Sequence, residues 1–472
     1  MQLTVGFDLD LTLIDPRPAV VAVATQLAVE EGVEIDAVLW ASRLGPPLEH
    51  ELAHWVQPDR VEPAAARYRE LMAGAGALIS LLPGAAEAVA AVRSSGGRAV
   101  VVTAKSEALA RAALDGLGVE VDAVVGWRWA EAKADALREH GATVYVGDHP
   151  GDVRAARAAS ALCVGVGTGG VEPVGADVRL EDLTCFPEWF AGHLLDVRLE
   201  ALGARLRETG GLLVAFSGGA DSAFLLAAAV RALGPERVVA ATAVSPSLAA
   251  DELLAAQAFA ASLGVRHVTP RTDELSREGY VANGADRCFH CKATLLDTLR
   301  PLAAELGLPA VATGTNADDA VAGFRPGIAA ASQRGALTPL LDAGLTKEQV
   351  RQASRRWGLA TADKPALACL ASRIAYGLQV TPAGLARVDR AERALRAHLG
   401  EVVHLRVRDL GESAARVELD PVALAACDDA AQDVVRAEGF ATVSAQEFHS
   451  GSMNDALTAG AGTAQQTEQR QP

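Results

Sequence analysis

A short apolar run, Leu212–Phe216, is followed by residues whose types suit phosphate binding. They are Ser217, Gly218, Gly219, Ala220, Asp221 and Ser222. Glycine lets main-chain N–H groups close on phosphate oxygens, and the start of a helix predicted at Ala223–Val230 adds partial positive charge. The serine hydroxyls can add donors, and the aspartate can help to hold Mg²⁺. We therefore expect this segment to cradle the pyrophosphate of a nucleotide.

A second group of residues, near the N-terminus, could carry out phosphoryl transfer. Asp8 and Asp10 leave the first predicted strand for a loop, the place where an α/β sheet presents catalytic groups. One carboxylate of such a pair can attack phosphorus as a nucleophile while the other transfers a proton. Further candidates end other predicted strands or open predicted helices: Thr103, Lys133, Asp148 and Asp152.

The phosphate-binding segment contains no Gly-Lys-Ser or Gly-Lys-Thr, so it is not the lysine-containing loop of the common P-loop NTPases. It resembles the PP-loop of ATP pyrophosphatases, which attack ATP at the α-phosphate and release pyrophosphate. That resemblance implies ATP and Mg²⁺ as cofactors and the adenylation of a substrate as the reaction.

The N-terminal motifs resemble those of the haloacid dehalogenase (HAD) phosphohydrolases over about residues 1–188. The resemblance implies that Asp8 is the nucleophile and Asp10 the general acid/base. It assigns phosphoryl binding to Thr103 and Lys133, and Mg²⁺ binding to Asp8, Asp148 and Asp152. The helical stretch inserted at about 17–80 resembles the cap of phosphoglycolate-phosphatase-like members. One departure is Leu11, where the family usually has Gly, and we expect it to tighten the loop.

Motifs after the PP-loop extend the second resemblance. They are Ala243–Ser247, Asp286–Lys292, Thr313–Asp319, Phe324–Gly327, Asp363–Gly377 and Gly451–Asn454. Over about residues 205–457 the chain resembles LarE, the ATP-dependent sulfur transferase that makes pyridinium-3,5-bisthiocarboxylic acid mononucleotide for the nickel-pincer cofactor. The resemblance implies adenylation of a pyridinium carboxylate mononucleotide and its conversion to a thiocarboxylate.

Such a conversion needs a good leaving group, which AMP supplies, and a sulfur nucleophile, for which a thiolate is well suited. Cys369 is the candidate, because the charges of the nearby Lys364 and Arg373 favour a thiolate. The family resemblance implies that the sulfur comes from this cysteine. A thioester forms, elimination leaves dehydroalanine, and the protein is consumed.

Cys288 and Cys291 form a CxxC pair, which by itself fits a metal or cluster site, a redox dithiol or two thiols packed near a helix start. With Cys369 the pair offers three ligands to a [4Fe–4S] cluster, leaving one iron open to an extra sulfide. Some LarE-like and tRNA-thiolating relatives look like that. We favour the cluster over a sacrificial Cys369.

Four arginines are candidates for binding the anionic groups of the substrate. Arg406 and Arg408 alternate along one predicted strand and therefore share a face. Two guanidiniums there suit a phosphate monoester, although a solvated strand face is the alternative. Arg325 and Arg373 are further candidates for phosphate or carboxylate.

Apolar strands alternate with helical segments almost throughout, which is typical of α/β domains with parallel sheets. We expect two Rossmann-like domains, a HAD domain at 1–188 and a PP-loop domain at 211–394. A helical connector at 189–210 would join them. A small α+β unit at 395–455 and a disordered tail at 456–472 would follow.

Strands should span these ranges: Leu3–Asp8, Ala99–Thr103, Thr143–Val146, Val238–Ala243, His267–Thr269, Ala310–Thr313, His404–Val407 and Ala415–Leu419.

The composition limits the partners. The net charge of −16, from 43 basic and 59 acidic residues, argues against a nucleic-acid clamp or an anionic membrane partner. No apolar run is long enough to span a bilayer, the N-terminus reads as a strand start rather than a signal peptide, and the six cysteines fit no secreted disulfide framework. We expect a cytoplasmic, soluble homo-oligomer that acts on a small-molecule nucleotide.

Two other functions remain open. Another PP-loop enzyme would thiolate tRNA or form an amide, but no basic RNA-binding region or glutaminase nucleophile is evident. Alternatively, one half of the chain could serve as a non-catalytic regulatory module. The presence of Asp8, Asp10, Lys133 and Asp148 favours an active phosphatase.

Overall fold

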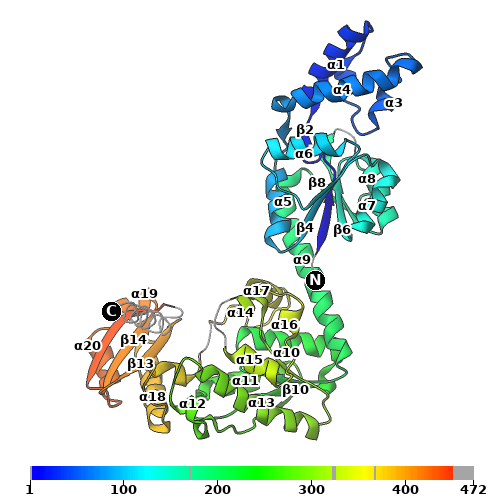
Figure 1. Cartoon of the computed structure of the whole chain (residues 1–472). Helices are drawn as coiled ribbons and strands as arrows, with labels where there is room; N and C mark the ends of the chain where they lie inside the picture. The colour runs from blue at the N-terminus through cyan, green and yellow to red at the C-terminus, as the bar shows by residue number, and fades with distance from the viewer. Residues whose placement is uncertain (1–2, 170–171, 322–325, 366–367, 450–472) are drawn as a thin grey trace, which may run out of the picture. The chain divides into compact units, whose positions relative to one another are not determined.

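The computed structural model describes residues 3–169, 172–321, 326–365 and 368–449 of the chain. The tail predicted at 456–472 lies outside these residues. The chain divides into two compact units, Met1–Leu194 and Leu195–Pro472, which are described separately (Figure 1). Both contain a parallel sheet, which confirms the α/β fold class with two Rossmann-like domains. Helix α9, Phe186–Glu208, runs through the residues where the helical connector was predicted.

Within the described part of the first unit, six strands form a parallel sheet in the order β5-β4-β1-β6-β7-β8. The strands are β1 (Thr4–Phe7), β4 (Arg98–Val102), β5 (Ala123–Val125), β6 (Ala142–Gly147), β7 (Leu162–Val166) and β8 (Val178–Leu180). Strands β1, β4 and β6 were predicted. Strands β5, β7 and β8 were not predicted; β5 and β8 have three residues each, whereas β7 has five.

Helices cover both faces of this sheet, so its central strands are largely buried and apolar. Helix α5 (Ala85–Ser94) lies on one side, and α7 (Lys133–Glu139) and α8 (Pro150–Ala159) lie together on the other (Figure 1). Helix α6 (Glu107–Gly116) connects β4 to β5.

The helical insert expected at 17–80 lies between β1 and β4. A short antiparallel pair, β2 (Ile14–Asp15) and β3 (Ser80–Leu81), forms its stem. Its helices are α1 (Arg17–Glu31), α2 (Ala37–Ala41), α3 (Leu48–Leu52) and α4 (Val61–Gly74). The insert has its own core, in which the rings of Trp40 and Tyr68 stack with centroids 5.1 Å apart. It therefore forms a compact cap.

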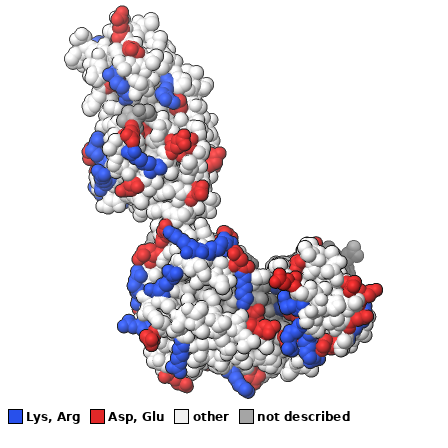
Figure 2. Space-filling model, turned by 180° about the vertical axis from the view of Figure 1, so that it is seen from behind, with Lys and Arg blue, Asp and Glu red and all other residues white. Residues whose placement is uncertain are grey.

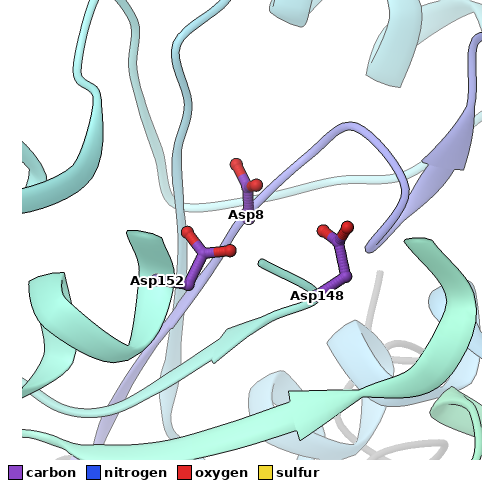
Figure 3. A group of neighbouring side chains, drawn as sticks. All are labelled: Asp8, Asp148 and Asp152. Atoms are coloured by element: carbon purple, nitrogen blue, oxygen red, sulfur yellow. The ribbon is translucent and has the colours of Figure 1, made fainter. Parts of the chain in front are cut away.

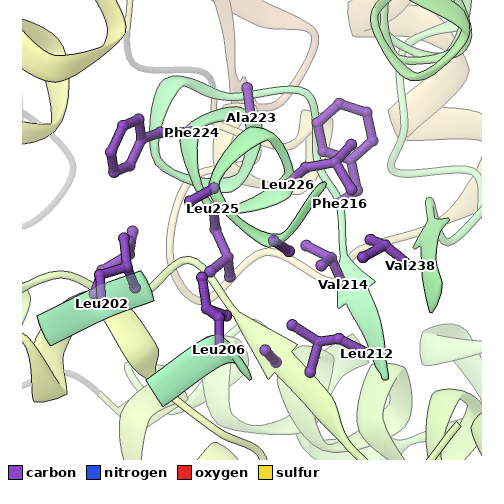
Figure 4. Close-up of a cluster of buried hydrophobic side chains, with 14 of the residues drawn as sticks. Leu202, Leu206, Leu212, Val214, Phe216, Ala223, Phe224, Leu225, Leu226 and Val238 are labelled. Atoms are coloured by element: carbon purple, nitrogen blue, oxygen red, sulfur yellow. The ribbon is translucent and has the colours of Figure 1, made fainter. Parts of the chain in front are cut away.

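In the second unit the parallel sheet has the order β11-β10-β9-β12. The strands are β9 (Leu212–Ala215), β10 (Val238–Ala241), β11 (Arg266–Val268) and β12 (Val311–Thr313), all close to prediction. Helix α10 (Ala220–Leu233) packs on β9, and its residues Phe224 and Leu225 belong to the same buried cluster as Leu206 of α9 (Figure 4). The carboxyl ends of β9 and β12 border the kind of crevice in which α/β sheets bind ligands.

Further helices surround this sheet. They are α11 (Ala250–Ser262), α12 (Glu278–Val281), α13 (Arg287–Glu305), α14 (Ala317–Val321), α15 (Pro326–Gln333), α16 (Pro339–Asp342) and α17 (Lys347–Arg356).

A smaller α+β region follows. Its sheet comprises β13 (Leu405–Gly411), antiparallel to β14 (Ala414–Leu419), which is parallel to β15 (Thr442–Glu447); its helices are α18 (Pro382–Leu399), α19 (Pro421–Ala425) and α20 (Asp429–Arg436). The predicted start at residue 395 is too late, because Leu385 and Val388 of α18 share a core with Leu405. The segment at Ile374 borders β13 and forms a parallel bridge with Asp409.

Two observations concern the expectations for membrane and nucleic-acid partners. Among the described helices, none combines the length and the apolar character that a membrane crossing requires. On the face shown in Figure 2, acidic and basic side chains are interspersed.

Two candidate active sites

Three aspartates of the first unit come together at one edge of its sheet. Asp8 directly follows β1, Asp148 directly follows β6, and Asp152 lies in the first turn of α8 (Figure 3). All three are buried, and carboxylate oxygens of the three lie within 4.8 Å of one another. Strands β1 and β6 pair in parallel, so their carboxyl ends meet at the same edge. The fold therefore assembles the triad that the sequence predicted.

Two glycines allow this close approach. A Cβ atom at Gly147 would lie 2.4 Å from Cγ of Asp152, and one at Gly169 would lie 1.9 Å from Oδ2 of Asp148. A larger residue at either position would displace a carboxylate from the triad.

Lys133 is the first residue of α7, as predicted, and its side chain is only 1% exposed. Its Nζ lies 2.9 Å from Oδ1 of Asp8 and 2.7 Å from Oδ1 of Asp152. A buried ammonium in this position orients Asp8 and offsets part of the repulsion among the carboxylates.

The cluster remains short of positive charge. Burial raises the pKa of Asp8 well above its usual value, although Lys133 opposes the shift. Burial, and next the neighbouring Asp152, raise the pKa of Asp148 to about 7. Three buried carboxylates face one ammonium, and carboxylate oxygens are ligands that Mg²⁺ prefers. The residues therefore fit a divalent cation held by Asp8, Asp148 and Asp152.

Asp10 faces a lysine that the sequence analysis did not single out. Nζ of Lys105 lies 2.8 Å from Oδ1 of Asp10. The main-chain N–H of Lys105 also donates to Oγ1 of Thr103, at 3.2 Å, and Thr103 is buried directly after β4. The sequence could have indicated this lysine, because it lies two residues after a threonine that ends a predicted strand.

The loop after β1 is tight, as expected at Leu11. Leu11 has a φ of +60°, a left-handed conformation that costs a side-chain-bearing residue about 1 kcal/mol. Its N–H donates to the carbonyl of Ile14 at 2.8 Å, and the hydroxyl of Thr12 donates to Oδ1 of Asp148 at 2.8 Å. The loop thereby supports one member of the triad.

A cavity lies over the triad, between the sheet edge and the cap. About 130 Å³ of it is open to the centres of water molecules. Residues of the core domain that line it include Asp8, Asp10, Thr103, Lys105, Lys133 and Asp148. Residues of the cap that line it include Trp40, Arg43, Tyr68, Arg69 and Met72. The residues predicted for phosphoryl transfer, except Asp152 beneath them, thus meet in one pocket.

The predicted phosphate cradle lies between β9 and α10. Gly218 has a φ of +73°, and Gly219 is the N-cap of α10. The hydroxyl oxygen of Ser222 accepts the N–H of Ser217 at 3.3 Å and lies 3.1 Å from the Ser217 hydroxyl. The two serines are therefore adjacent at a helix N-terminus, whose N–H groups suit an anion.

The loop after β12 packs on this cradle. A Cβ atom at Gly314 would lie 2.8 Å from the main-chain nitrogen of Ser222, so only glycine permits the approach. The amide of Asn316 donates to Oδ1 of Asp221 at 3.2 Å, and Nζ of Lys347 lies 2.9 Å from Oδ2. Sequence reasoning missed Lys347, because nothing near it in the chain resembles a site.

Lys364 also reaches the cradle. Its Nζ donates to the carbonyl of Gly218 at 3.0 Å and lies 3.0 Å from a carboxylate oxygen of Glu252. From the sequence we expected this ammonium to act on Cys369, whereas in the structure it bonds to the loop Ser217–Ser222.

Three cysteines lie in one neighbourhood of the second unit. Cys288 and Cys291 are in the first turns of α13, and Cys369 precedes a short 3₁₀ turn, Leu370–Arg373. Burial is the largest cause that raises the pKa of Cys291 to about 12, and Cys369 is the next. Cys288 acts in the same direction. The structure thus brings the three predicted sulfur ligands near one another.

Two buried residues beside the CxxC pair hold the Cys369 segment. Arg287 donates to the carbonyl of Ala371 at 2.9 Å. The amide of Asn283 donates to the carbonyl of Ala375 at 2.8 Å. These bonds fix the segment against the start of α13.

The predicted arginines have different surroundings. Arg408 is buried, and its guanidinium lies 2.9 Å from Glu418 and donates to the carbonyl of Ser372 at 2.6 Å. Instead of presenting its charge to a substrate, Arg408 supports the Cys369 segment. Arg373 is also mostly buried and lies 2.8 Å from Glu392.

Arg406 is half-buried on β13 and is the better candidate for binding an anion. The pKa of Arg406 is lowered to about 10, first by burial and next by the nearby positive charges of Arg373 and Arg408. Such a concentration of positive charge suits a phosphate or carboxylate group. Arg325 lies outside the described residues.

Comparison with known proteins also divides the chain into an N-terminal part and a C-terminal part with different relatives. Residues 5–166 match the haloacid dehalogenase-like hydrolase family. A haloacid dehalogenase-like hydrolase from Streptococcus pneumoniae is 21% identical, with a match that covers 40% of this chain and 98% of that one at a TM-score of 0.37. The family match and the aspartate triad define the N-terminal unit as a haloacid dehalogenase-like hydrolase domain.

The remainder of the chain matches curated proteins. An uncharacterized protein of Synechocystis sp., slr1717, is 41% identical over 275 residues, which are 56% of this chain and 100% of the relative. Pyridinium-3,5-bisthiocarboxylic acid mononucleotide synthase of Lactiplantibacillus plantarum is 31% identical over 269 residues, 56% of this chain and 96% of the relative. Through its C-terminal half the chain belongs to the family of this synthase, LarE, and it joins that family to the hydrolase domain.

Proposed function

We propose that the N-terminal unit hydrolyses phosphate monoesters with Mg²⁺. Asp8 attacks phosphorus, the bond to the leaving oxygen breaks, and Asp10 gives its proton to that oxygen. Asp10 then takes a proton from water, which attacks the aspartyl phosphate and releases inorganic phosphate. Bound Mg²⁺ would neutralise charge on the transferred group. The observation that carries this proposal is Lys133, buried between Asp8 and Asp152 at the floor of a cavity.

Hydrolysis of para-nitrophenyl phosphate by the full chain tests this function. Asp8→Asn should lower kcat about a thousandfold or more, because no nucleophile remains. Asp135→Asn is a matched control, because its carboxylate is 83% exposed on α7. Equal activity of Asp8→Asn and the wild-type protein would refute the proposal.

We propose further that the second unit is an ATP-dependent sulfur transferase acting on a pyridinium carboxylate mononucleotide. The carboxylate oxygen attacks the α-phosphorus of ATP, pyrophosphate leaves, and sulfur then displaces AMP. The loop Ser217–Ser222 would hold the pyrophosphate, while Arg406 would bind an anionic group of the substrate. The loop at the N-terminus of α10, the three thiols and the half-buried Arg406 support the proposal, as does the name of the relative from Lactiplantibacillus plantarum.

Two sources of sulfur are chemically consistent with the thiols. Cys369 can form a thioester, and loss of its α-proton with cleavage of its Cβ–S bond releases the thiocarboxylate and leaves dehydroalanine. Alternatively, Cys288, Cys291 and Cys369 bind a [4Fe–4S] cluster that supplies sulfide. Three thiolates can hold a [4Fe–4S] cluster and leave one iron open to an extra sulfide. We favour the cluster.

Anaerobic purification with iron and sulfide quantitation distinguishes the two sources. A cluster predicts stoichiometric iron that is lost in Cys291→Ser. Intact mass is then measured after incubation with ATP and a pyridinium dicarboxylate mononucleotide. A decrease of about 34 Da at Cys369, the mass of H₂S, without bound iron would establish the sacrificial route instead. Failure to release pyrophosphate in the presence of the mononucleotide would refute the transferase proposal itself.

A further inference from the structure

Trp127 has an unusual backbone conformation at the wall of the first unit's cavity. Its φ is +58°, and its N–H donates to the carbonyl of Lys105 at 3.0 Å. A bulky residue in this left-handed region is a genuine outlier, and such strain persists mainly at functional sites. Glycine would adopt the conformation without strain. Backbone geometry therefore does not explain why tryptophan stands here.

Burial does not explain it either. Trp127 is 52% exposed and lines the cavity that contains Asp8 and Lys133. A large aromatic side chain that is half exposed contributes little to the hydrophobic core, and here its backbone is also strained. Its exposed ring can contact a ligand bound in the cavity.

The cap already places a planar group on this ring. The guanidinium carbon of Arg69 lies 4.7 Å from the centroid of the Trp127 ring, and Arg69 is held by an ion pair with Glu49. Guanidinium planes and flat heteroaromatic rings both stack on aromatic side chains. The indole therefore offers a surface on which planar groups stack, and Arg69 already stacks there.

The cavity has room for more than a phosphoryl group. The 130 Å³ open to water centres corresponds to roughly ten water molecules, at about 10–15 Å³ each. Ten waters occupy on the order of 300 Å³ of liquid, which is comparable to the volume of a mononucleotide. One cavity thus contains the reacting residues and the exposed indole.

We infer that the hydrolase site takes phosphate monoesters whose alcohol carries a flat aromatic or heteroaromatic ring, of about the size of a mononucleotide, and that Trp127 recognises the ring by stacking. This inference rests on the proposed hydrolase function. The phosphoryl group occupies the floor at Asp8, and the ring lies against the indole beside Arg69. Small aliphatic phosphates fill the floor alone and lack this contact.

Uridine 5′-monophosphate and ribose 5-phosphate test the inference, because they differ chiefly by the ring. The full chain with Mg²⁺ should show a higher kcat/KM for the nucleotide. Trp127→Gly removes the ring and relieves the backbone strain. It should lower the ratio of the two kcat/KM values by about five- to 150-fold, the range spanned by base–aromatic stacking, chiefly through KM for the nucleotide. Trp127→Phe should retain most of the ratio.

Leu78→Ala is the matched control, because Leu78 is a 45% exposed apolar residue of the cap that does not line the cavity. It should leave the ratio unchanged. An unchanged ratio in Trp127→Gly, or a wild-type protein that cleaves ribose 5-phosphate as well as the nucleotide, would overturn the inference. Cleavage of para-nitrophenyl phosphate without cleavage of the nucleotide would also overturn it. Absence of all phosphatase activity would refute the hydrolase function instead.

Discussion

The guanidinium of Arg287 donates a hydrogen bond of 2.9 Å to the main-chain oxygen of Ala371. Arg287 directly precedes Cys288, and Ala371 lies two residues after Cys369, so one bond joins the two cysteine-bearing segments. Both residues are buried, and a hydrogen bond sheltered from water is strengthened by the low local dielectric. The relative positions of the thiols therefore depend on this contact.

Arg287→Ala should loosen the Cys369 segment. The substitution leaves buried oxygens of Asn283 and Ala371 without their donor, which costs about 1–3 kcal/mol for each unsatisfied group. Hydrogen exchange followed by mass spectrometry should show faster exchange within residues 371–378, by about tenfold or more. Arg300→Ala, an exposed position of the same helix, should leave the exchange unchanged. Equal protection in both variants would contradict this prediction.

Lys133→Met should abolish phosphatase activity and destabilise the metal-free protein. Methionine is unbranched and only one atom shorter than lysine, but it leaves Asp8 and Asp152 buried without their ammonium. Thermal unfolding in EDTA should begin at a lower temperature than for the wild-type protein. Arg138→Met on the same helix is the control, because Arg138 is 52% exposed. Unaltered activity in Lys133→Met would show that this lysine does not serve the reaction.

Mg²⁺ should raise the unfolding temperature of the wild-type protein, because it binds a triad that exists only in the folded state. A concentration 100 times the Kd would add about 2.7 kcal/mol of stability. Asp148→Asn should diminish the shift by removing one charged ligand, whereas Asp135→Asn should retain it. The shift is measured by calorimetry with and without excess EDTA. A shift that survives in Asp148→Asn would place the cation elsewhere.

Protonation of His267 should lower the free energy of unfolding as the solution becomes more acidic. Burial lowers the pKa of His267 below its usual value, and its Nε2 lies 2.8 Å from Oγ1 of Thr242. The unfolded chain therefore binds a proton more readily, so this contribution is present above pH 6.5 and is lost as pH falls through the histidine range. His267→Gln should lose less stability between pH 7 and pH 5 in thermal unfolding. Parallel profiles would exclude His267 as a cause.

Strand ends were predictable, and they determined much of the hydrolase site. Asp8, Thr103 and Asp148 each follow a buried apolar strand, and parallel pairing brings such ends to one edge whatever the details of packing. Trp127 could not be found in this way. Trp127 is distinguished by its backbone dihedral angle and its exposed ring, and both depend on the folded structure.

Long charged side chains were the least predictable. The sequence indicated Lys364 and Arg408 as candidates, but it did not indicate what they contact. Their charged groups lie several bonds from the backbone and bind partners from distant segments. In the structure Lys364 bonds to the carbonyl of Gly218 and Arg408 pairs with Glu418. Such partners follow from tertiary contacts rather than from spacing.

The segment after Cys369 also borders the outer edge of β13, through the bridge between Ile374 and Asp409 and a 2.9 Å bond from the N–H of Ala375. An uncovered strand edge is a template for pairing with another chain, and natural proteins cover or blunt such edges. Any event that releases this segment would unmask the edge and favour aggregation. The residues that hold the segment after Cys369 in place would thus also protect the protein against self-association.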